Sequence, residues 1–310
     1  MTEKAESFKR LRARIRKLPP LPTAVVHPCD AESLRGAIDA WRKQLIVPVL
    51  VGPEAKIRRA AADAKLSLKG LRLIATEHSH AAAEAAVALA RERRVECLMK
   101  GSLHTDELMA AVVAPDGGLR TARRISHVFV LDVPAYPRPL LITDAAINIY
   151  PDLEAKRDIV QNAIDLAHAL GIRRPRVAIL SAVETVTSKI RSTIDAAALC
   201  KMADRGQITG GILDGPLAFD IAISEEARRA KDVPSDVAGR PDILIVPDLE
   251  AGNMLVKQLQ YLSGARCAGV VLGARVPIAL TSRADSAETR MASCAIAVLL
   301  RAHLSKGPRA

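Results

Sequence analysis

Short apolar runs of strand character alternate with amphipathic helical runs along almost the whole chain of 310 residues. Some of these runs, such as Leu45–Val51 and Ala268–Leu272, are continuously apolar, as strands are when both faces of their sheet are covered. The alternation predicts an α/β architecture with mainly parallel sheets. We expect the other strands at Ala24–His27, Leu71–Ala75, Glu96–Met99, His127–Asp132, Leu140–Thr143, Arg176–Leu180, Gly211–Leu213, Ile243–Val246 and Ile278–Leu280.

Helix-capping residues stand between the predicted strands. Asp30 can cap a helix over Ala31–Gln44, and Pro53 suits the first turn of a helix over Glu54–Lys65. A further helix is predicted to run from Asp152 to Leu170 and to end at Gly171.

One neighbouring pair of strands breaks the alternation. Only Val133–Pro139, with three prolines, connects His127–Asp132 to Leu140–Thr143. This connection is too short for a parallel crossover, so we expect the two strands to pair antiparallel.

Two crossings between domains are also predicted. The turn-rich Pro115–Gly118 indicates the first, and Arg275–Pro277 the second. The predicted domains are therefore residues 1–115 plus 277–310 and residues 116–276. A cleft between domains is a common place for a small-molecule site.

The charge balance favours anionic partners. Net charge is +11, from 45 Lys and Arg against 34 Asp and Glu, while aromatic residues make up only 2%. So few aromatic residues argue against a surface that stacks on nucleic-acid bases. A basic run near the start is interpreted as a solvated helix face or tail rather than a nucleic-acid arm: Lys9, Arg10, Arg12, Arg14, Arg16 and Lys17.

Targeting and metal signals are missing. No signal-peptide pattern follows Met1, and no apolar run approaches the roughly 20 residues of a membrane span. We expect a cytoplasmic protein that binds neither membranes nor nucleic acid. The five cysteines form no CxxC or Cys/His cluster, so we expect no metal site and no disulfide framework. The chain also lacks the Rossmann, P-loop, zinc-protease and α/β-hydrolase motifs.

The stretch Thr281–Ser286 has the composition of an anion site. A predicted strand leads into it and a helix is predicted to start near Ser286. The turn therefore carries a hydroxyl, a guanidinium and a carboxylate at a helix N-terminus, whose dipole attracts negative charge. This arrangement suits an anionic substrate and a proton transfer.

Five other segments carry polar residues at the ends of predicted strands. Singly, each is typical of turn and cap chemistry. They are Met99–Thr105, Leu119–Ser126, Ile142–Asn148, Leu213–Asp220 and Pro247–Asn253.

Taken together, these motifs resemble those of the phosphate acetyltransferase/phosphate butyryltransferase family. The matching stretches read KGSLHT, SHVFVLD, ITDAAIN, LDGPLAFD, PDLEAGN and TSRADS, in an order and spacing that fit together over about Val95–Leu299. The resemblance implies the reversible reaction of acyl-CoA with phosphate to give acyl phosphate and coenzyme A. It also implies two three-layer α/β domains with a cleft between them, similar to the isocitrate/isopropylmalate dehydrogenase fold, a homodimer, and no metal or cofactor besides coenzyme A as substrate.

The resemblance assigns Ser282 and Arg283 as a catalytic pair. Arg283 is expected to hold the phosphoryl group and the developing oxyanion, and Ser282 to orient the thiol. Acetyltransferases carry an aspartate where this chain has Thr289, so Asp285 becomes the hypothetical base, with Glu288 as the alternative. Asp285 could instead only cap the helix.

Further residues are expected to bind substrate. Acetyltransferases usually place an arginine in the helix after KGSLHT, but here that helix reads DELMAAVVA, so Arg120, Arg123 or Arg124 is expected to supply the charge. Glu250 and Asn253 could equally anchor the helix after Pro247. The expected substrate-binding residues are Lys100, Ser102, His104, Thr105, Arg120, Asp144, Asn148, Glu250, Asn253 and Glu288.

Alternative functions stay open at this point. Phosphate acetyltransferase is the leading expectation, although the TSRADS form resembles the butyryltransferase branch, which uses a longer acyl substrate. A decarboxylating dehydrogenase would need metal-binding carboxylates grouped on one helix and a nicotinamide loop, and the sequence offers neither. A non-catalytic two-domain anion-binding protein is the third alternative.

Overall fold

The computed structural model describes residues 13–305 of the chain. They divide into two compact units, which we call the N-terminal unit (13–123 and 268–305) and the central unit (124–267). The sequence placed the crossings at 115/116 and 276/277, and the assignment of these stretches as domains stays a prediction. Within the basic run, Lys9, Arg10 and Arg12 lie outside the described residues, whereas Arg14, Arg16 and Lys17 are exposed.

The N-terminal unit contains a mostly parallel sheet in the order β3-β2-β1-β4-β11-β10. Only the pairing of β10 with β11 is antiparallel. These apolar strands form as predicted, with Ala24, Val25 and Val26 of β1 fully buried. The bounds are β1 (Leu21–Val26), β2 (Ile46–Gly52), β3 (Arg72–Ala75), β4 (Cys97–Lys100), β10 (Arg266–Leu272) and β11 (Ile278–Ala279).

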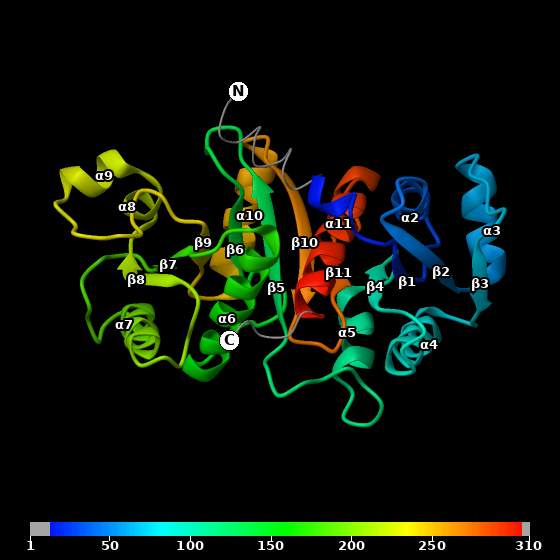
Figure 1. The fold of residues 1–310 in the computed structure, drawn as a ribbon, viewed down its shortest axis with the longest axis horizontal. Coiled ribbons are helices and arrows are strands. Elements are labelled where there is room, and N and C mark those ends of the chain that lie inside the picture. Colours follow the sequence, from blue (N-terminus) through cyan, green and yellow to red (C-terminus); the bar gives the residue numbers. More distant parts are fainter. Residues whose placement is uncertain (1–12, 306–310) are drawn as a thin grey trace. The chain divides into compact units, whose positions relative to one another are not determined.

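Helices cover both faces of this sheet, which gives the predicted three layers (Figure 1). Helix α2 packs with α11 on one face, and α4 packs with α5 on the other. Asp30 caps α2 as predicted, because its Oδ1 accepts the Ser33 N–H at 2.7 Å. Pro53 occupies the N-cap position of α3. The bounds are α2 (Ala31–Arg42), α3 (Glu54–Asp63), α4 (Ser79–Arg91), α5 (Thr105–Val113) and α11 (Ala287–Leu304).

The central unit contains a second set of strands in the order β5-β6-β9-β7-β8. Strands β5 and β6 pair antiparallel, which confirms the prediction made from their short, proline-rich connection. The remaining pairs are parallel. The bounds are β5 (Ser126–Asp132), β6 (Leu140–Thr143), β7 (Arg176–Leu180), β8 (Ile212–Leu217) and β9 (Ile243–Ile245).

One face of these strands forms a core with α8 and α10, to which β6, β7, β9 and both helices contribute buried side chains. Helices α6 and α7 pack together and contact the sheet as well (Figure 1). Gly171 ends α6 with a φ of 97°, as predicted. The bounds are α6 (Leu153–Leu170), α7 (Arg191–Asp204), α8 (Phe219–Ile223), α9 (Glu225–Ala230) and α10 (Leu249–Tyr261).

Strand β8 corrects one expectation from the sequence. We predicted a strand over Gly211–Leu213 followed by a polar turn, but β8 continues through Asp214 and Gly215–Pro216 to Leu217. The strand has only β7 as a neighbour, so Pro216 removes no hydrogen bond that a second partner would need. The register of the pairing between β7 and β8 shifts between Ala178, which is opposite Asp214, and Leu180, which is opposite Leu217. Gly215 and Pro216 lie within this irregular stretch of β8.

No helix within residues 13–305 is long and apolar enough to cross a membrane.

Candidate active site

Three loops of the N-terminal unit follow neighbouring parallel strands. Strand β4 lies between β1 and β11, with Lys100 opposite Val26 and with Met99 opposite Ala279. The residues that follow these three strands therefore meet at the same edge of the sheet. In open α/β sheets this carboxyl edge is where ligands bind.

The turn after β4 is fixed against the end of β1. Gly101 donates its N–H to Val26 O at 2.9 Å, and Ser102 donates its N–H to His27 O at 3.0 Å. The Ser102 hydroxyl donates to the same His27 carbonyl at 2.8 Å and lies 3.1 Å from Nδ1 of the His27 ring. A Cβ at Gly101 would lie 2.4 Å from Val26 O, so this close approach requires glycine. Ser102 thus sits in a rigid turn.

The loop after β11 exposes two of the three predicted catalytic side chains. Ser282 and Arg283 are exposed, whereas Asp285 is only 4% exposed. The Asp285 Oδ2 accepts the Ser282 N–H at 2.7 Å, so this carboxylate holds the loop in shape. Ser286 is the N-cap of α11, because its Oγ accepts the Thr289 N–H. The alternative in which Asp285 only caps the helix is therefore wrong.

Predicted residues from the two loops meet. Arg283 Nη1 lies 3.4 Å from His104 Nε2, and His104 is the N-cap of α5. Lys100, only 2% exposed, donates from Nζ to Thr281 O at 3.4 Å. Its burial, together with the charges of Arg290 and Arg283, lowers the pKa of Lys100 to about 8. This edge of the unit therefore combines exposed donors with buried positive charge.

Two further residues support the loop but were not selected from the sequence. Glu32 Oε2 accepts the Ala287 N–H at 2.9 Å, and Arg290 is almost wholly buried beneath the loop. The signal for Arg290 was its spacing. It follows Ala287 by three residues and precedes Cys294 by four, which places an arginine on the buried stripe of α11.

The remaining predicted residues of this unit are less enclosed. Thr105 is the first residue of α5 and is partly buried. Arg120 is exposed and its backbone forms an isolated bridge with Ala274. Glu288 is exposed in the first turn of α11.

In the central unit, Asp144 and Asn148 fix the loop after β6. Both side chains are buried, at 3% and 4% exposed. Asp144 Oδ2 accepts the Asn148 side-chain amide at 2.6 Å, and Asp144 Oδ1 accepts the Ala146 and Ile147 N–H groups. Asn148 Oδ1 accepts Arg124 Nε at 2.7 Å. The loop that the sequence assigned to substrate is thus internally satisfied.

Glu250 and Asn253 tie the start of α10 to the same loop. Asn253 donates from Nδ2 to Ala145 O at 3.3 Å, and Tyr150 donates its hydroxyl to Glu250 Oε2 at 3.1 Å. Asp248 caps the helix by accepting the Ala251 N–H. The anchoring role considered for Glu250 and Asn253 is therefore present in the structure.

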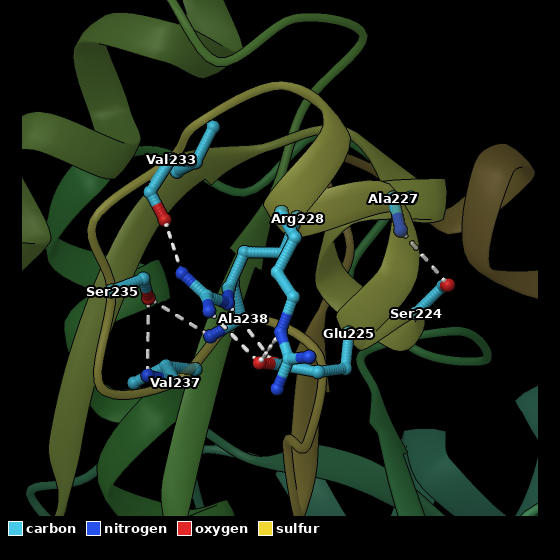
Figure 2. Close-up of polar contacts among 9 residues, drawn as sticks. Ser224, Glu225, Ala227, Arg228, Val233, Ser235, Val237 and Ala238 are labelled. Atoms are coloured by element: carbon cyan, nitrogen blue, oxygen red, sulfur yellow. Dashed lines mark hydrogen bonds and ion pairs between the residues drawn. The ribbon is translucent and has the colours of Figure 1, made fainter.

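A second polar cluster lies at α9 and the loop that follows it. Figure 2 shows Arg228 against Glu225, to which it donates two hydrogen bonds, of 3.0 and 2.8 Å. This pairing, with help from Arg229, lowers the pKa of Glu225 to about 2. Ser235 Oγ accepts the N–H groups of Val237 and Ala238. The cluster contains none of the predicted site residues and stabilises its own loop.

Among residues 13–305, no group of three or more His, Cys, Asp or Glu side chains could hold a metal ion. A cavity of about 410 Å³ lies between α4 and α5, and none of the predicted site residues lines it.

The sequence and the fold both have close counterparts among known proteins. The chain is 66% identical to a phosphate acetyltransferase of Rhizobium meliloti, over 95% of this chain and 93% of that protein. It is 40% identical to a phosphate butyryltransferase of Clostridium beijerinckii, over 96% and 99%.

Two solved structures share the fold. A branched-chain phosphotransacylase from Enterococcus faecalis superposes with a TM-score of 0.79 at 28% identity, over 91% of this chain and 99% of that one. A 4-hydroxythreonine-4-phosphate dehydrogenase from Klebsiella pneumoniae gives a TM-score of 0.54 at 14% identity, over 91% and 98%. The second likeness concerns the fold alone and confirms the expected similarity to a dehydrogenase-type fold.

The sequence model of the family described as "Phosphate acetyl/butaryl transferase" matches residues 74–298, which include the loops after β4, β6 and β11. Together with the identity to the Rhizobium and Clostridium enzymes, this match means that the chain belongs to the phosphate acetyl/butyryl transferase family.

Proposed function

We propose that this protein is a phosphate acetyltransferase that transfers an acetyl group between coenzyme A and phosphate. The observation that carries the proposal is the exposed pair Ser282–Arg283, which stands beside His104 at the carboxyl edge of a parallel sheet. The acetyl substrate is favoured over butyryl because the acetyltransferase of Rhizobium is 66% identical and the butyryltransferase of Clostridium is 40% identical.

In the proposed mechanism, the thiolate of coenzyme A attacks the carbonyl carbon of acetyl phosphate. The carbon–sulfur bond forms, negative charge develops on the carbonyl oxygen, and the bond to the phosphate oxygen then breaks. Arg283 binds the phosphoryl group and stabilises the oxyanion, since its planar fork matches both. Ser282 orients the sulfur, and Asp285 accepts the thiol proton. The reaction uses coenzyme A as a substrate and no other cofactor.

The other predicted residues provide the surroundings of the reacting atoms. Lys100 contributes positive charge from below the loop, and His104 supports Arg283. We propose that Ser102, Thr105, Arg120 and Glu288 of the N-terminal unit also contribute to substrate binding. We propose the same for Asp144, Asn148, Glu250 and Asn253 of the central unit.

The first test is catalytic activity with purified protein. Mixing it with acetyl phosphate and coenzyme A should consume free thiol without added metal or nicotinamide, and the kcat/KM should be highest for acetyl in a panel of acetyl, propionyl and butyryl substrates. Arg283→Gln should lower kcat/KM by about 10²–10³-fold, because it removes a fixed donor to the oxyanion. Arg59→Gln, an exposed arginine of α3, is the matched control and should retain full activity.

Absence of thiol loss with all three acyl phosphates would favour the non-catalytic binding protein instead. A maximum for butyryl would favour the butyryltransferase.

The role of Asp285 can be separated from its structural contact. Asp285→Asn keeps an oxygen that can accept the Ser282 N–H but cannot take up a proton. If Asp285 is the base, Asp285→Asn and Asp285→Ala should both lower kcat by about 10²-fold or more. If kcat is normal in Asp285→Asn but lowered in Asp285→Ala, the role of Asp285 is only to shape the loop. If kcat is lowered in Glu288→Gln instead, Glu288 is the base.

The pH dependence follows from Lys100. Its pKa is lowered to about 8, so its ammonium group loses a proton as the pH rises through that value, and the attraction for anions falls. We expect the inhibition constant of sulfate, whose charge stays constant over this range, to rise above about pH 8. Lys100→Met should bind sulfate more weakly than the parent below about pH 8 and should show no such rise. An unchanged rise in this variant would contradict the assignment.

The homodimer is proposed on the apolar surface of the central unit. Met254, Tyr261 and Leu262 of α10 and its end are 66–80% exposed, and Ile149 and Tyr150 beside the start of the helix are 60% and 74% exposed. Exposed large apolar side chains gathered on neighbouring segments are typical of an interface between subunits. Light scattering of the parent protein should give twice the chain mass of 33.2 kDa. The double variant Met254→Glu/Leu262→Glu should instead give the mass of a single chain. A monomeric parent protein would refute the dimer.

A cytoplasmic location is proposed as well. All five cysteines are free, which suits a reducing compartment. Cell fractionation that recovered the protein outside the cytoplasm would contradict it.

A further inference from the structure

Arg290 lies directly beneath the loop that carries Ser282 and Arg283. It is 1% exposed and among the largest fully buried side chains within residues 13–305. Its Nη1 donates to Lys100 O and to Thr281 Oγ1, each at 3.2 Å. Its Nη2 donates to Ser282 O at 3.1 Å and to Arg283 O at 3.4 Å. One guanidinium therefore joins the end of β4 to three successive residues of the catalytic loop.

The burial of the Arg290 guanidinium carries a desolvation cost. None of the ion pairs among the described residues includes Arg290, and its Nε is buried without a hydrogen-bond partner. Burial lowers the pKa of Arg290, and the carboxylates of Asp30, Asp285 and Glu32 compensate only in part. Replacing Arg290 alone by an apolar side chain would leave the four oxygens to which it donates without this donor. An apolar side chain also cannot reproduce the planar guanidinium, which donates hydrogen bonds to several oxygens at once.

The position of Arg290 depends on the residues that surround it. A Cβ on Gly36 of α2 would lie 2.8 Å from Arg290 Cβ and 3.2 Å from its Cδ, so the glycine provides the space that the side chain occupies. Asp285 accepts a hydrogen bond from the Ser282 N–H, and Arg290 donates one to the Ser282 carbonyl. Both hydrogen-bonding groups of the Ser282 backbone are thus fixed by side chains.

We propose that Arg290 is a positioning residue for the acyl transfer, which fixes the backbone of Ser282 and Arg283 so that their side chains meet the reacting atoms, while Arg290 itself does not touch substrate. The inference rests on the proposed function of the Ser282–Arg283 pair. Misplacement of reacting groups by about 1 Å can lower a rate by about 10²-fold. Arg290 contacts this backbone at three carbonyls, those of Lys100, Ser282 and Arg283.

A second consequence concerns the neighbouring lysine. The charged groups that act on Lys100 are Arg290 of α11, Arg283 and Asp285 of the loop, and Asp30 at the start of α2. Among these charges Arg290 lowers the pKa of Lys100 most, after burial itself. Removal of the Arg290 charge should therefore move the pH above which sulfate inhibition weakens to a higher value, whereas a lysine at position 290 should not move it.

The experiment compares Arg290→Met and Arg290→Lys with Arg301→Met as the matched control. Arg301 lies on the same helix but pairs with Glu96 at 2.8 Å at the surface, so its loss should leave kcat unchanged. We expect Arg290→Met to lower kcat by about 10²-fold, guanidinium ion to restore part of it, and Arg290→Lys to give an intermediate value because it keeps charge without the fork. A lowered melting temperature with a wild-type kcat would overturn the proposal.

Two measurements keep the proposal testable if Arg290→Met does not fold or if the parent protein lacks the proposed activity. Gly36→Ala keeps the guanidinium of Arg290 but crowds its side chain, so it should lower kcat. Arg35→Ala, at an exposed position of the same helix, is the matched control and should not lower kcat. Hydrogen exchange of the peptide over residues 280–286 should be faster in Arg290→Lys and Gly36→Ala than in the parent, whether or not acyl transfer is observed. Unchanged exchange in both variants would refute the positioning role, and absent activity in the parent would refute only the proposed function.

Discussion

The parallel pairing of β11 with β4 determines which residues can act together in this protein. Strand β11 has only two residues, yet its register places Ile278 opposite Leu98 and Ala279 opposite Met99. Because β4 also pairs in parallel with β1, the loops that follow all three strands lie at one edge. Segments far apart in the sequence thereby contribute to one group of residues, and the side chains beneath the edge then decide how each loop is held.

The electrostatics of that edge follow from what is buried there. Lys100 and Arg290 place two cationic groups beneath the loop, and Arg283 adds a third at the surface. Asp285 uses a carboxylate oxygen on the Ser282 N–H, and Glu32 uses one on the Ala287 N–H. One oxygen of each carboxylate is thus bonded to the backbone, whereas Arg283 stays at the surface. Such a distribution attracts an anion more strongly than exposed lysines would, since the buried charges are poorly screened by solvent.

Much of the fold could be predicted from the sequence because apolar periodicity reflects burial. The alternation of elements, the antiparallel pair β5–β6, the cap at Asp30 and the end of α6 at Gly171 all agree with the structure. Strand β8 did not, since Gly215–Pro216 is typical of a turn and only the position of the strand in the sheet permits it. The order of strands also depends on pairings between distant segments, which local patterns do not encode.

The sequence indicated which strand ends carry candidate site residues, but not which of their side chains would be exposed and which buried. The motifs selected Ser282, Arg283 and Asp285, and the loop geometry separates two exposed side chains from one that is buried. Asp144 and Asn148 were expected to face a substrate, yet their polar atoms bond to each other and to the surrounding loop. Arg290 was overlooked because a charged residue in a helix usually lies at the surface, and only its spacing relative to Ala287 and Cys294 indicates otherwise.

Three of the four acceptors that Arg290 contacts are main-chain carbonyls, those of Lys100, Ser282 and Arg283. Every amino acid supplies such a carbonyl, so these three contacts do not depend on which side chains stand at positions 100, 282 and 283, whereas Thr281 and Asp285 hold the loop through their own side chains. Ala284, exposed between Arg283 and Asp285, takes no part in this anchoring. The loop is accordingly a place where evolution or protein engineering can change chemical selectivity one side chain at a time, while the scaffold under it keeps the same geometry.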